Sequence, residues 1–99
     1  MENLMDVVQP DFKVGRVEVY KNHSSKSEAK WFALIENVEV EEDKCVRGFK
    51  LLDNAKDWAQ AFFFFDREIF GESTIQEIAE RADDITHFWI KKYDSFSSL

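Results

Sequence analysis

The sequence holds few of the residues that cross-link a chain or break its regular structure. It has one cysteine, one proline and three glycines in 99 residues. Cys45 cannot form a disulfide within the chain, which fits a reducing cytosol. The glycines stand apart at positions 15, 48 and 71, so no glycine-rich phosphate loop is present, and cysteine and histidine lack zinc-site spacing. We therefore expect no cofactor.

Basic charge is scarce as well. Lysine and arginine number 13 against 20 acidic residues, which gives a formal net charge of −7. Direct binding to nucleic acid or to an anionic membrane is therefore disfavoured, because both need a basic surface. No run approaches the roughly 20 apolar residues of a membrane helix, and Met1–Val8 carries no basic residue that could begin a signal peptide. These features predict a cytoplasmic protein whose partner is a protein with a basic surface.

Apolar residues make up 44% of the chain, and ten of its aromatic residues are phenylalanine. That content supports a modest core, and a chain of this length forms one domain over residues 1–99. The mixed, polar composition of residues 1–11 predicts a loosely ordered leader, with Leu4 and Met5 as possible partner contacts. Residues 94–99 are predicted to be a frayed tail.

Three stretches are predicted to be strands: Phe12–Tyr20, Lys30–Glu41 and Cys45–Leu52. The second begins with an apolar run without alternation, Trp31 to Ile35, which is typical of a strand that is covered on both sides or central in its sheet. In the first, the apolar parity changes at Gly15, and a one-residue bulge there would place all its apolar side chains on one face. In the second, Val38 and Val40 are expected to point inward. Glu41 to Lys44 is predicted to be a hairpin turn. Short connections favour an antiparallel meander.

Two helices should follow. In Asp53–Phe70 one stripe is formed by Trp58, Ala61, Phe62, Phe65 and Ile69. In Ser73 to about Tyr93, Ser73 and Gln76 match a capping box, and the stripe includes Ile75, Ile78, Ala79, Ala82 and Ile85. The predicted fold class is α+β: a three-stranded antiparallel β-meander followed by a two-helix hairpin packed on one face (β-β-β-α-α).

Two surface features are candidates for binding a partner. The first is an acidic cluster of Glu36, Glu39, Glu41, Glu42 and Asp43, which could dock on a basic groove; the alternative is a merely solvated turn. The second is a pair of rings off the helical stripes, Phe64 and Phe88, which could form an apolar contact patch. Those rings could equally be covered within the fold or lie in a homodimer seam.

The sequence offers no convincing group of catalytic residues. Glu80, Asp83, Asp84 and His87 lie on one helical face and could bind a divalent metal. Such a site needs matching ligands on another helix, for which Asp66 and Glu68 are only loose candidates, and a face of this kind is more often solvated, so no metal is predicted. A Cys45–His23 pair would need an accident of folding, because Cys45 has an inward parity. No serine lies in a nucleophile elbow. We predict that the protein is not an enzyme.

Three segments together, Val17–Asn22, Ala33–Val38 and Asp53–Phe62, resemble the strand–turn–strand–helix run of some small phage-encoded anti-CRISPR proteins. The resemblance covers about half the chain, and no contact residue is carried over. It implies a viral protein, acting in the host cytoplasm, that binds a CRISPR effector and blocks its nucleic-acid path. The expected function is thus that of a small acidic inhibitor that occludes a basic or nucleic-acid-binding surface. The alternative is a homodimeric structural or assembly subunit.

Overall fold

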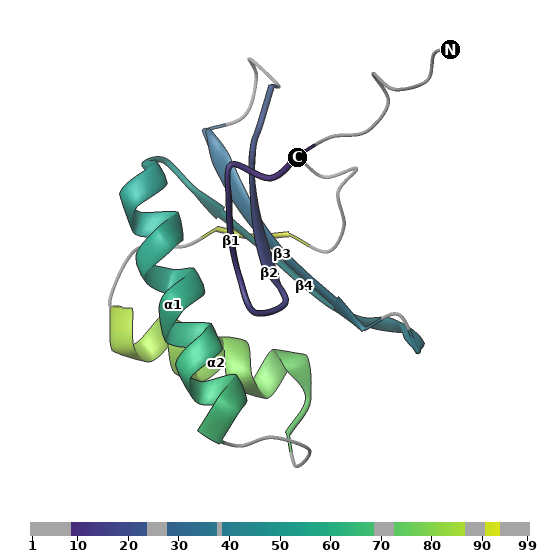
Figure 1. The fold of residues 1–99 in the computed structure, drawn as a ribbon. Coiled ribbons are helices and arrows are strands. Elements are labelled where there is room, and N and C mark those ends of the chain that lie inside the picture. Colours follow the sequence, from purple (N-terminus) through teal and green to yellow (C-terminus); the bar gives the residue numbers. More distant parts are fainter. Residues whose placement is uncertain (1–8, 24–27, 38, 69–72, 87–90, 94–99) are drawn as a thin grey trace.

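The computed structural model describes residues 9–23, 28–37, 39–68, 73–86 and 91–93, and they form a sheet with two helices on one of its faces (Figure 1). In chain order the elements are β1 (Phe12–Val14), β2 (Val17–Lys21), β3 (Trp31–Asn37), β4 (Val40–Phe49), α1 (Leu52–Glu68), α2 (Ile75–Thr86) and β5 (Lys91–Tyr93). The strands pair antiparallel in the order β1-β2-β3-β4-β5. The α+β class is confirmed, but the prediction of three strands is wrong.

The predicted first strand is in fact a hairpin of two strands. Gly15 has φ +57°, and the chain reverses at Gly15 and Arg16 so that Val14 pairs with Val17. A left-handed φ costs glycine little, because it has no Cβ. Phe12 pairs with Val19, so the apolar side chains do share one face as expected, through a reversal and not through a bulge.

The turn between the second and third predicted strands was placed too late. Glu41 to Lys44 lie within β4, and the chain reverses earlier, between the paired residues Asn37 and Val40. The Asn37 side chain explains this position, since its Oδ1 accepts the backbone N–H of Glu39 at 2.9 Å. Val40 is 46% exposed, so the prediction that it points inward is wrong, while Val38 lies outside the described residues.

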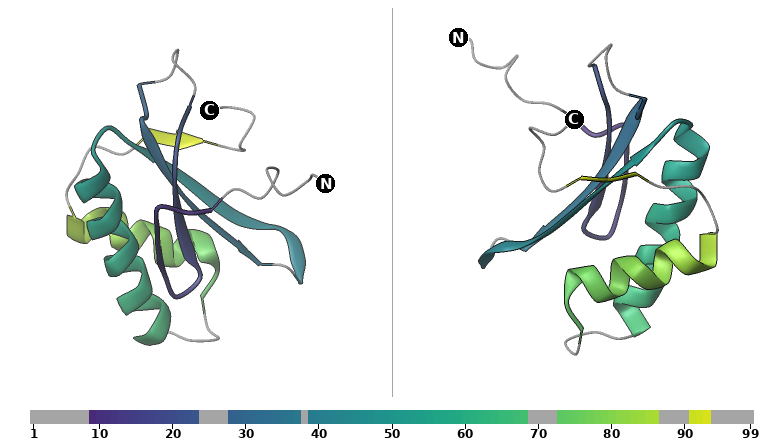
Figure 2. Two further views of the ribbon diagram at one scale, coloured as in Figure 1. Left: turned by 45° about the horizontal axis from the view of Figure 1, so that its top comes forward. Right: turned by 180° about the vertical axis from the view of Figure 1, so that it is seen from behind.

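The second helix is shorter than predicted. It ends at Thr86, and Lys91–Tyr93 form β5, which pairs with Val46–Gly48 of β4. The capping box is also one residue later: the Glu77 N–H donates to Thr74 Oγ1 at 3.2 Å, and the Thr74 N–H donates to Glu77 Oε1 at 3.0 Å. In Figures 1 and 2, α2 runs across α1 and not alongside it.

The core lies between the helices and the sheet. Trp58 and Phe62 of α1 are fully buried, with ring centroids 5.6 Å apart, and Phe49 of β4 lies 6.0 Å from Trp58. Both helices also contribute small residues to this core: Ala55, Ala59, Ala79 and Ala82 are all fully buried. The predicted stripes are therefore largely confirmed, except that Ile85 is 53% exposed; Ile69 lies outside the described residues.

Candidate functional site

The far end of the β3–β4 hairpin is rich in acidic residues. We call residues 36–44 the acidic arm; it holds five carboxylates and one lysine. The ribbon shows this hairpin extending past the helices (Figures 1 and 2). Glu36 and Glu39 are exposed and Asp43 is half-buried. Glu41 and Glu42 have their backbone in β4, and the structure describes nothing of their side chains.

Asn37 holds the tip of the acidic arm together. Besides accepting the Glu39 N–H, its Nδ2 donates to Asp43 Oδ2 at 3.5 Å, a long hydrogen bond. The β3–β4 ladder shifts register at Glu36 and Asn37, which leaves extra residues on the β4 side. Such an irregularity makes this part of the outer edge of β4 a poor template for pairing with another strand.

A hollow of about 610 Å³ lies beside the acidic arm, and we call it the acidic hollow. Glu39 and Asp43 line it from the arm, Asp66 from α1, and Arg16 from the β1–β2 turn; Asn37, Ser73 and Ile78 complete the lining. Among the described residues that line it, three carboxylates stand against one guanidinium, so this part of the wall is net negative. The hollow thus favours a cationic group over an anionic one.

Arg16 is already engaged. Its Nε and Nη2 each donate to one oxygen of Asp66 at 3.0 Å, a bidentate pair. The Arg16 side chain is 40% exposed and that of Asp66 19%, so the pair lies at the rim. This ion pair neutralises Asp66, which leaves Glu39 and Asp43 as the carboxylates that give the hollow its negative charge.

Glu36 belongs to a different surface. It lines a smaller hollow of about 270 Å³ with Lys13, Arg16, Glu18 and Leu34. Nearby, the Tyr20 hydroxyl donates to Glu18 Oε1 at 2.9 Å. The pKa of Tyr20 is raised to about 12 by burial, by that hydrogen bond, and by the negative charges of Glu18 and then Glu36. The predicted acidic cluster therefore splits, with Glu36 on one hollow and Glu39 and Asp43 on the other.

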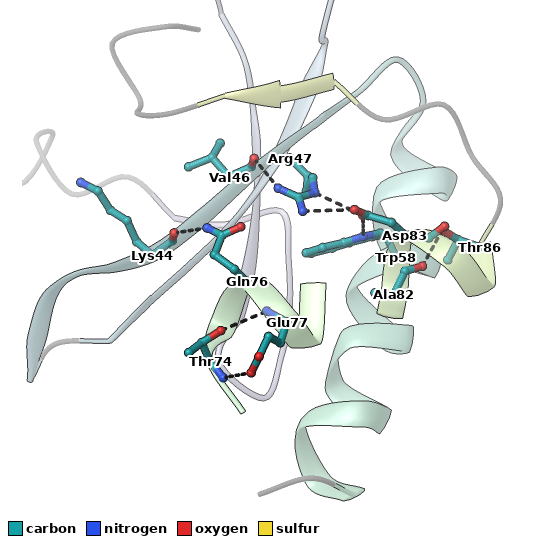
Figure 3. Close-up of polar contacts among 10 residues, drawn as sticks. All are labelled: Lys44, Val46, Arg47, Trp58, Thr74, Gln76, Glu77, Ala82, Asp83 and Thr86. Atoms are coloured by element: carbon teal, nitrogen blue, oxygen red, sulfur yellow. Dashed lines mark hydrogen bonds and ion pairs between the residues drawn. The ribbon is translucent and has the colours of Figure 1, made fainter. Parts of the chain in front are cut away.

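The helical layer meets the acidic arm through α2 (Figure 3). Gln76 lies on the first turn of α2, and its Nε2 donates to the backbone carbonyl of Lys44 at 2.8 Å. Because Thr74 and Glu77 form the capping box, the Gln76 amide is free to make this tertiary contact. Neither Gln76 nor Asn37 was predicted as a site residue. The Asn37–Glu39 contact is local and typical of asparagine in a turn, whereas the Gln76–Lys44 contact spans 32 positions and depends on how the hairpin and α2 pack.

Of the two rings in the predicted aromatic patch, only Phe64 lies within the described residues. Phe64 is 55% exposed and meets Phe65 edge-on, with ring centroids 5.3 Å apart. Phe88 lies outside the described residues. The other large apolar residues that are well exposed in the described part of the chain are Val40, Leu51 and Ile85.

The candidate metal face of the second helix does not form as one surface. Asp83 turns inward, where its two oxygens accept Arg47 Nε at 3.2 Å and Arg47 Nη2 at 3.1 Å (Figure 3). Its Oδ1 also accepts Trp58 Nε1–H at 2.7 Å. Glu80 and Asp84 are exposed, and His87 lies outside the described residues. Among the residues that the structure describes, no group of three or more acidic, histidine or cysteine side chains could hold a metal ion.

Comparison with known proteins finds no relative of this chain: no family model, no curated protein and no solved structure matches it. The anti-CRISPR resemblance therefore stays a prediction from the sequence. Within the described ranges, neither helix is long and apolar enough to cross a membrane.

Proposed function

We propose that this protein is a small, acidic, non-enzymatic inhibitor that binds a larger complex and occludes a basic or nucleic-acid-binding surface. A CRISPR effector is the leading target, with the inhibitor encoded by a phage or another mobile element and acting in the host cytoplasm. Its contact surface is the acidic arm with the acidic hollow. Dense negative charge on a projecting element raises the rate of encounter with a basic surface and makes binding sensitive to salt.

One observation carries this proposal: the acidic arm concentrates carboxylates where the hairpin extends beyond the helices. In a merely solvated acidic turn, the carboxylates would point into solvent and would not line a hollow. Here Glu39 and Asp43 line a hollow in which Arg16, the cation among its described lining residues, already pairs with Asp66. Exposed Val40 adds an apolar contact in the same arm.

The test is capture from the lysate of a host cell on immobilised protein, with salt steps and mass spectrometry. The charge-reversed variant Glu39→Lys/Glu41→Lys/Glu42→Lys removes the negative arm. Its matched control, Asp57→Lys/Glu80→Lys/Asp84→Lys, makes the same change in net charge at exposed helical positions. The protein and the control should retain a nucleic-acid-handling complex at low salt, and added nucleic acid should release it. The arm variant should not retain it.

Two results would overturn the proposal. If the arm variant retained the same complex as the protein, the arm would not be the contact. If the control lost binding as fully as the arm variant, total charge and not the arm would be responsible. An inhibition assay on the purified complex, measuring its nucleic-acid binding with and without the protein, completes the test.

The second candidate is a homodimeric structural or assembly subunit. It is favoured by Phe64, whose ring is more than half exposed on α1 and backed by Phe65. Aromatic side chains, phenylalanine included, are enriched in protein–protein interfaces. A mass that depends on protein concentration would distinguish this candidate from a monomeric inhibitor.

A further inference from the structure

The sheet has two faces, and the helices α1 and α2 cover one of them (Figures 1 and 2). Ala33 and Cys45 point to the covered face, where they belong to the core formed with the helices. Leu34 and Val46 follow them in β3 and β4 and are paired with each other. Because successive side chains of a strand point to opposite faces, Leu34 and Val46 lie on the other side of the sheet, which we call the second face.

Leu34 and Val46 are nevertheless buried. Leu34 is 5% exposed and Val46 is 1% exposed, and neither belongs to the core formed with the helices. Beside them on the second face, Tyr20 and Phe32 are half-buried and stack with ring centroids 5.5 Å apart. Side chains of one face stand roughly perpendicular to the sheet, so neighbours flank one another and leave the outer ends open. The burial of Leu34 and Val46 therefore requires a cover that the described elements do not supply.

The end of β5 lies next to this buried pair. Its last residue, Tyr93, pairs with Val46 at the outer edge of β4. Residues 94–99 follow Tyr93 and carry two large apolar side chains, Phe96 and Leu99. The residues before β5 lead instead from α2, which lies on the opposite face.

The outer edge of β4 prevents β5 from continuing along it. The Phe49 carbonyl accepts the Lys30 N–H on the β3 side. Backbone groups alternate in direction along a strand, so Lys44, at an odd spacing from Phe49, presents its carbonyl to the outer edge. Gln76 Nε2 of α2 donates to that carbonyl oxygen at 2.8 Å (Figure 3). A strand continuing past Tyr93 would need the edge position that Gln76 already occupies.

We propose that residues 94–99 fold across the second face and cover Leu34 and Val46. Phe96 and Leu99 make the apolar contacts. These residues lie outside the described ranges, and composition alone predicted a frayed tail for them. The segment is long enough, because neighbouring strands lie about 4.8 Å apart, which places β3 about 10 Å from β5, and six extended residues span up to about 20 Å.

The proposal goes beyond the proposed function and does not depend on it. The cover is made by apolar contacts, so it does not use the charge of the acidic arm. Because the occupant belongs to the same chain, the apolar surface of the second face is satisfied within one molecule and is not offered to a second copy.

The direct test is a nuclear Overhauser spectrum of the full chain. It should show contacts from the ring protons of Phe96 or the methyl groups of Leu99 to the methyl groups of Leu34 and Val46. The absence of these contacts would overturn the proposal. Contacts seen only between labelled and unlabelled copies in a mixed sample would overturn it as well, because the occupant would then be a second copy.

Substitution provides an independent readout. Phe96→Ser/Leu99→Ser should uncover the second face, so it should lower the urea midpoint of unfolding and raise several-fold the fluorescence of a dye that binds apolar surface. The matched control Leu4→Ser/Met5→Ser removes the same number of apolar side chains from residues 1–8 and should change neither quantity.

The outcomes separate this proposal from the proposed function. If Phe96→Ser/Leu99→Ser matched the unaltered protein in both quantities, the cover would be wrong. If the control changed both quantities instead, residues 1–8 would be the cover. Salt-dependent capture through the acidic arm should be the same in both variants. Failure of the cover therefore leaves the proposed function standing, and loss of capture in the charge-reversed arm variant leaves the cover standing.

Discussion

At the scale of single residues, Gly15 decides the shape of the first hairpin. Its φ of +57° lies in the left-handed region, and a Cβ built on it would lie 2.5 Å from Cδ1 of Phe63. The turn thus rests directly on the ring of an α1 residue, and Arg67 lies over the same ring at 5.5 Å. A glycine is required here for two reasons, backbone conformation and contact.

Gly15→Ala should therefore destabilise the protein. The left-handed backbone costs alanine about 1–2 kcal/mol, and displacing the Phe63 ring adds a cost of overpacking of about 1 kcal/mol or more. Urea unfolding followed by circular dichroism would measure the change. Gly15→Asn is the control, because asparagine tolerates this conformation but brings the same Cβ. If both variants unfolded as the original protein does, the close approach to Phe63 would be wrong.

The capping box at the start of α2 shows what a local sequence pattern can and cannot predict. Ser73 with Gln76, and Thr74 with Glu77, both fit the pattern of a hydroxyl followed three residues later by an amide or acid. The structure uses Thr74 and Glu77, while the Gln76 amide bonds to Lys44 of the neighbouring strand. Because that bond is tertiary, the sequence could predict a cap here but not which frame would form it.

At the scale of elements, a buried ion pair ties β4 to both helices. The Arg47 side chain is 3% exposed and pairs with Asp83 of α2, which also accepts a hydrogen bond from Trp58 of α1. Thr86, the last residue of α2, donates its hydroxyl to the Ala82 carbonyl within the same helix at 2.8 Å (Figure 3). The network fixes where α2 crosses the sheet, since a buried guanidinium needs its partner in one place.

Asp83→Ala should be strongly destabilising, because it leaves the Arg47 charge buried without a carboxylate. A loss of about 3–5 kcal/mol in the free energy of unfolding is expected. The double variant Arg47→Met/Asp83→Ala should recover part of that loss, because the uncompensated charge is gone. Denaturant unfolding of both variants checks this. A double variant no more stable than Asp83→Ala would contradict the assigned role of the charge.

The number of strands was also decided by how the elements pair with one another. The alternation along Phe12–Tyr20 correctly indicated strand structure. It could not distinguish a bulge at Gly15 from a hairpin turn there, because either one places the apolar side chains before and after Gly15 on the same face of the sheet. Likewise Lys91–Tyr93 carried no strand signal of its own, because a short edge strand is defined by its pairing with β4.

At the scale of the whole molecule, charge and exposed apolar surface favour different kinds of association. The net charge of −7 opposes contact between two copies, whereas the exposed Phe64 ring favours it. The proposed inhibitor contacts its target through the acidic arm, on a different element from Phe64.

The protein should therefore be a monomer in solution. Sedimentation or light scattering should give a mass of 11.7 kDa at every concentration, and Phe64→Ser should give the same mass. Gln60→Ala is the control for substitution of an exposed residue of α1. A dimeric mass that reverted to the monomer in Phe64→Ser would instead place the seam at Phe64 and favour the structural subunit.

The sequence by itself determined the α+β class, the two amphipathic helices and the excess of acid on residues 36–44. These properties are local, since a helical stripe such as Trp58 and Phe62 depends only on spacing along the chain. The tertiary structure decided which side chains meet: Arg16 with Asp66, 50 positions apart, and Arg47 with Asp83, 36 positions apart. It also turned Asp83 inward and placed Glu39 and Asp43 on a common hollow. Such contacts follow from strand register and helix packing, which no short stretch of sequence specifies.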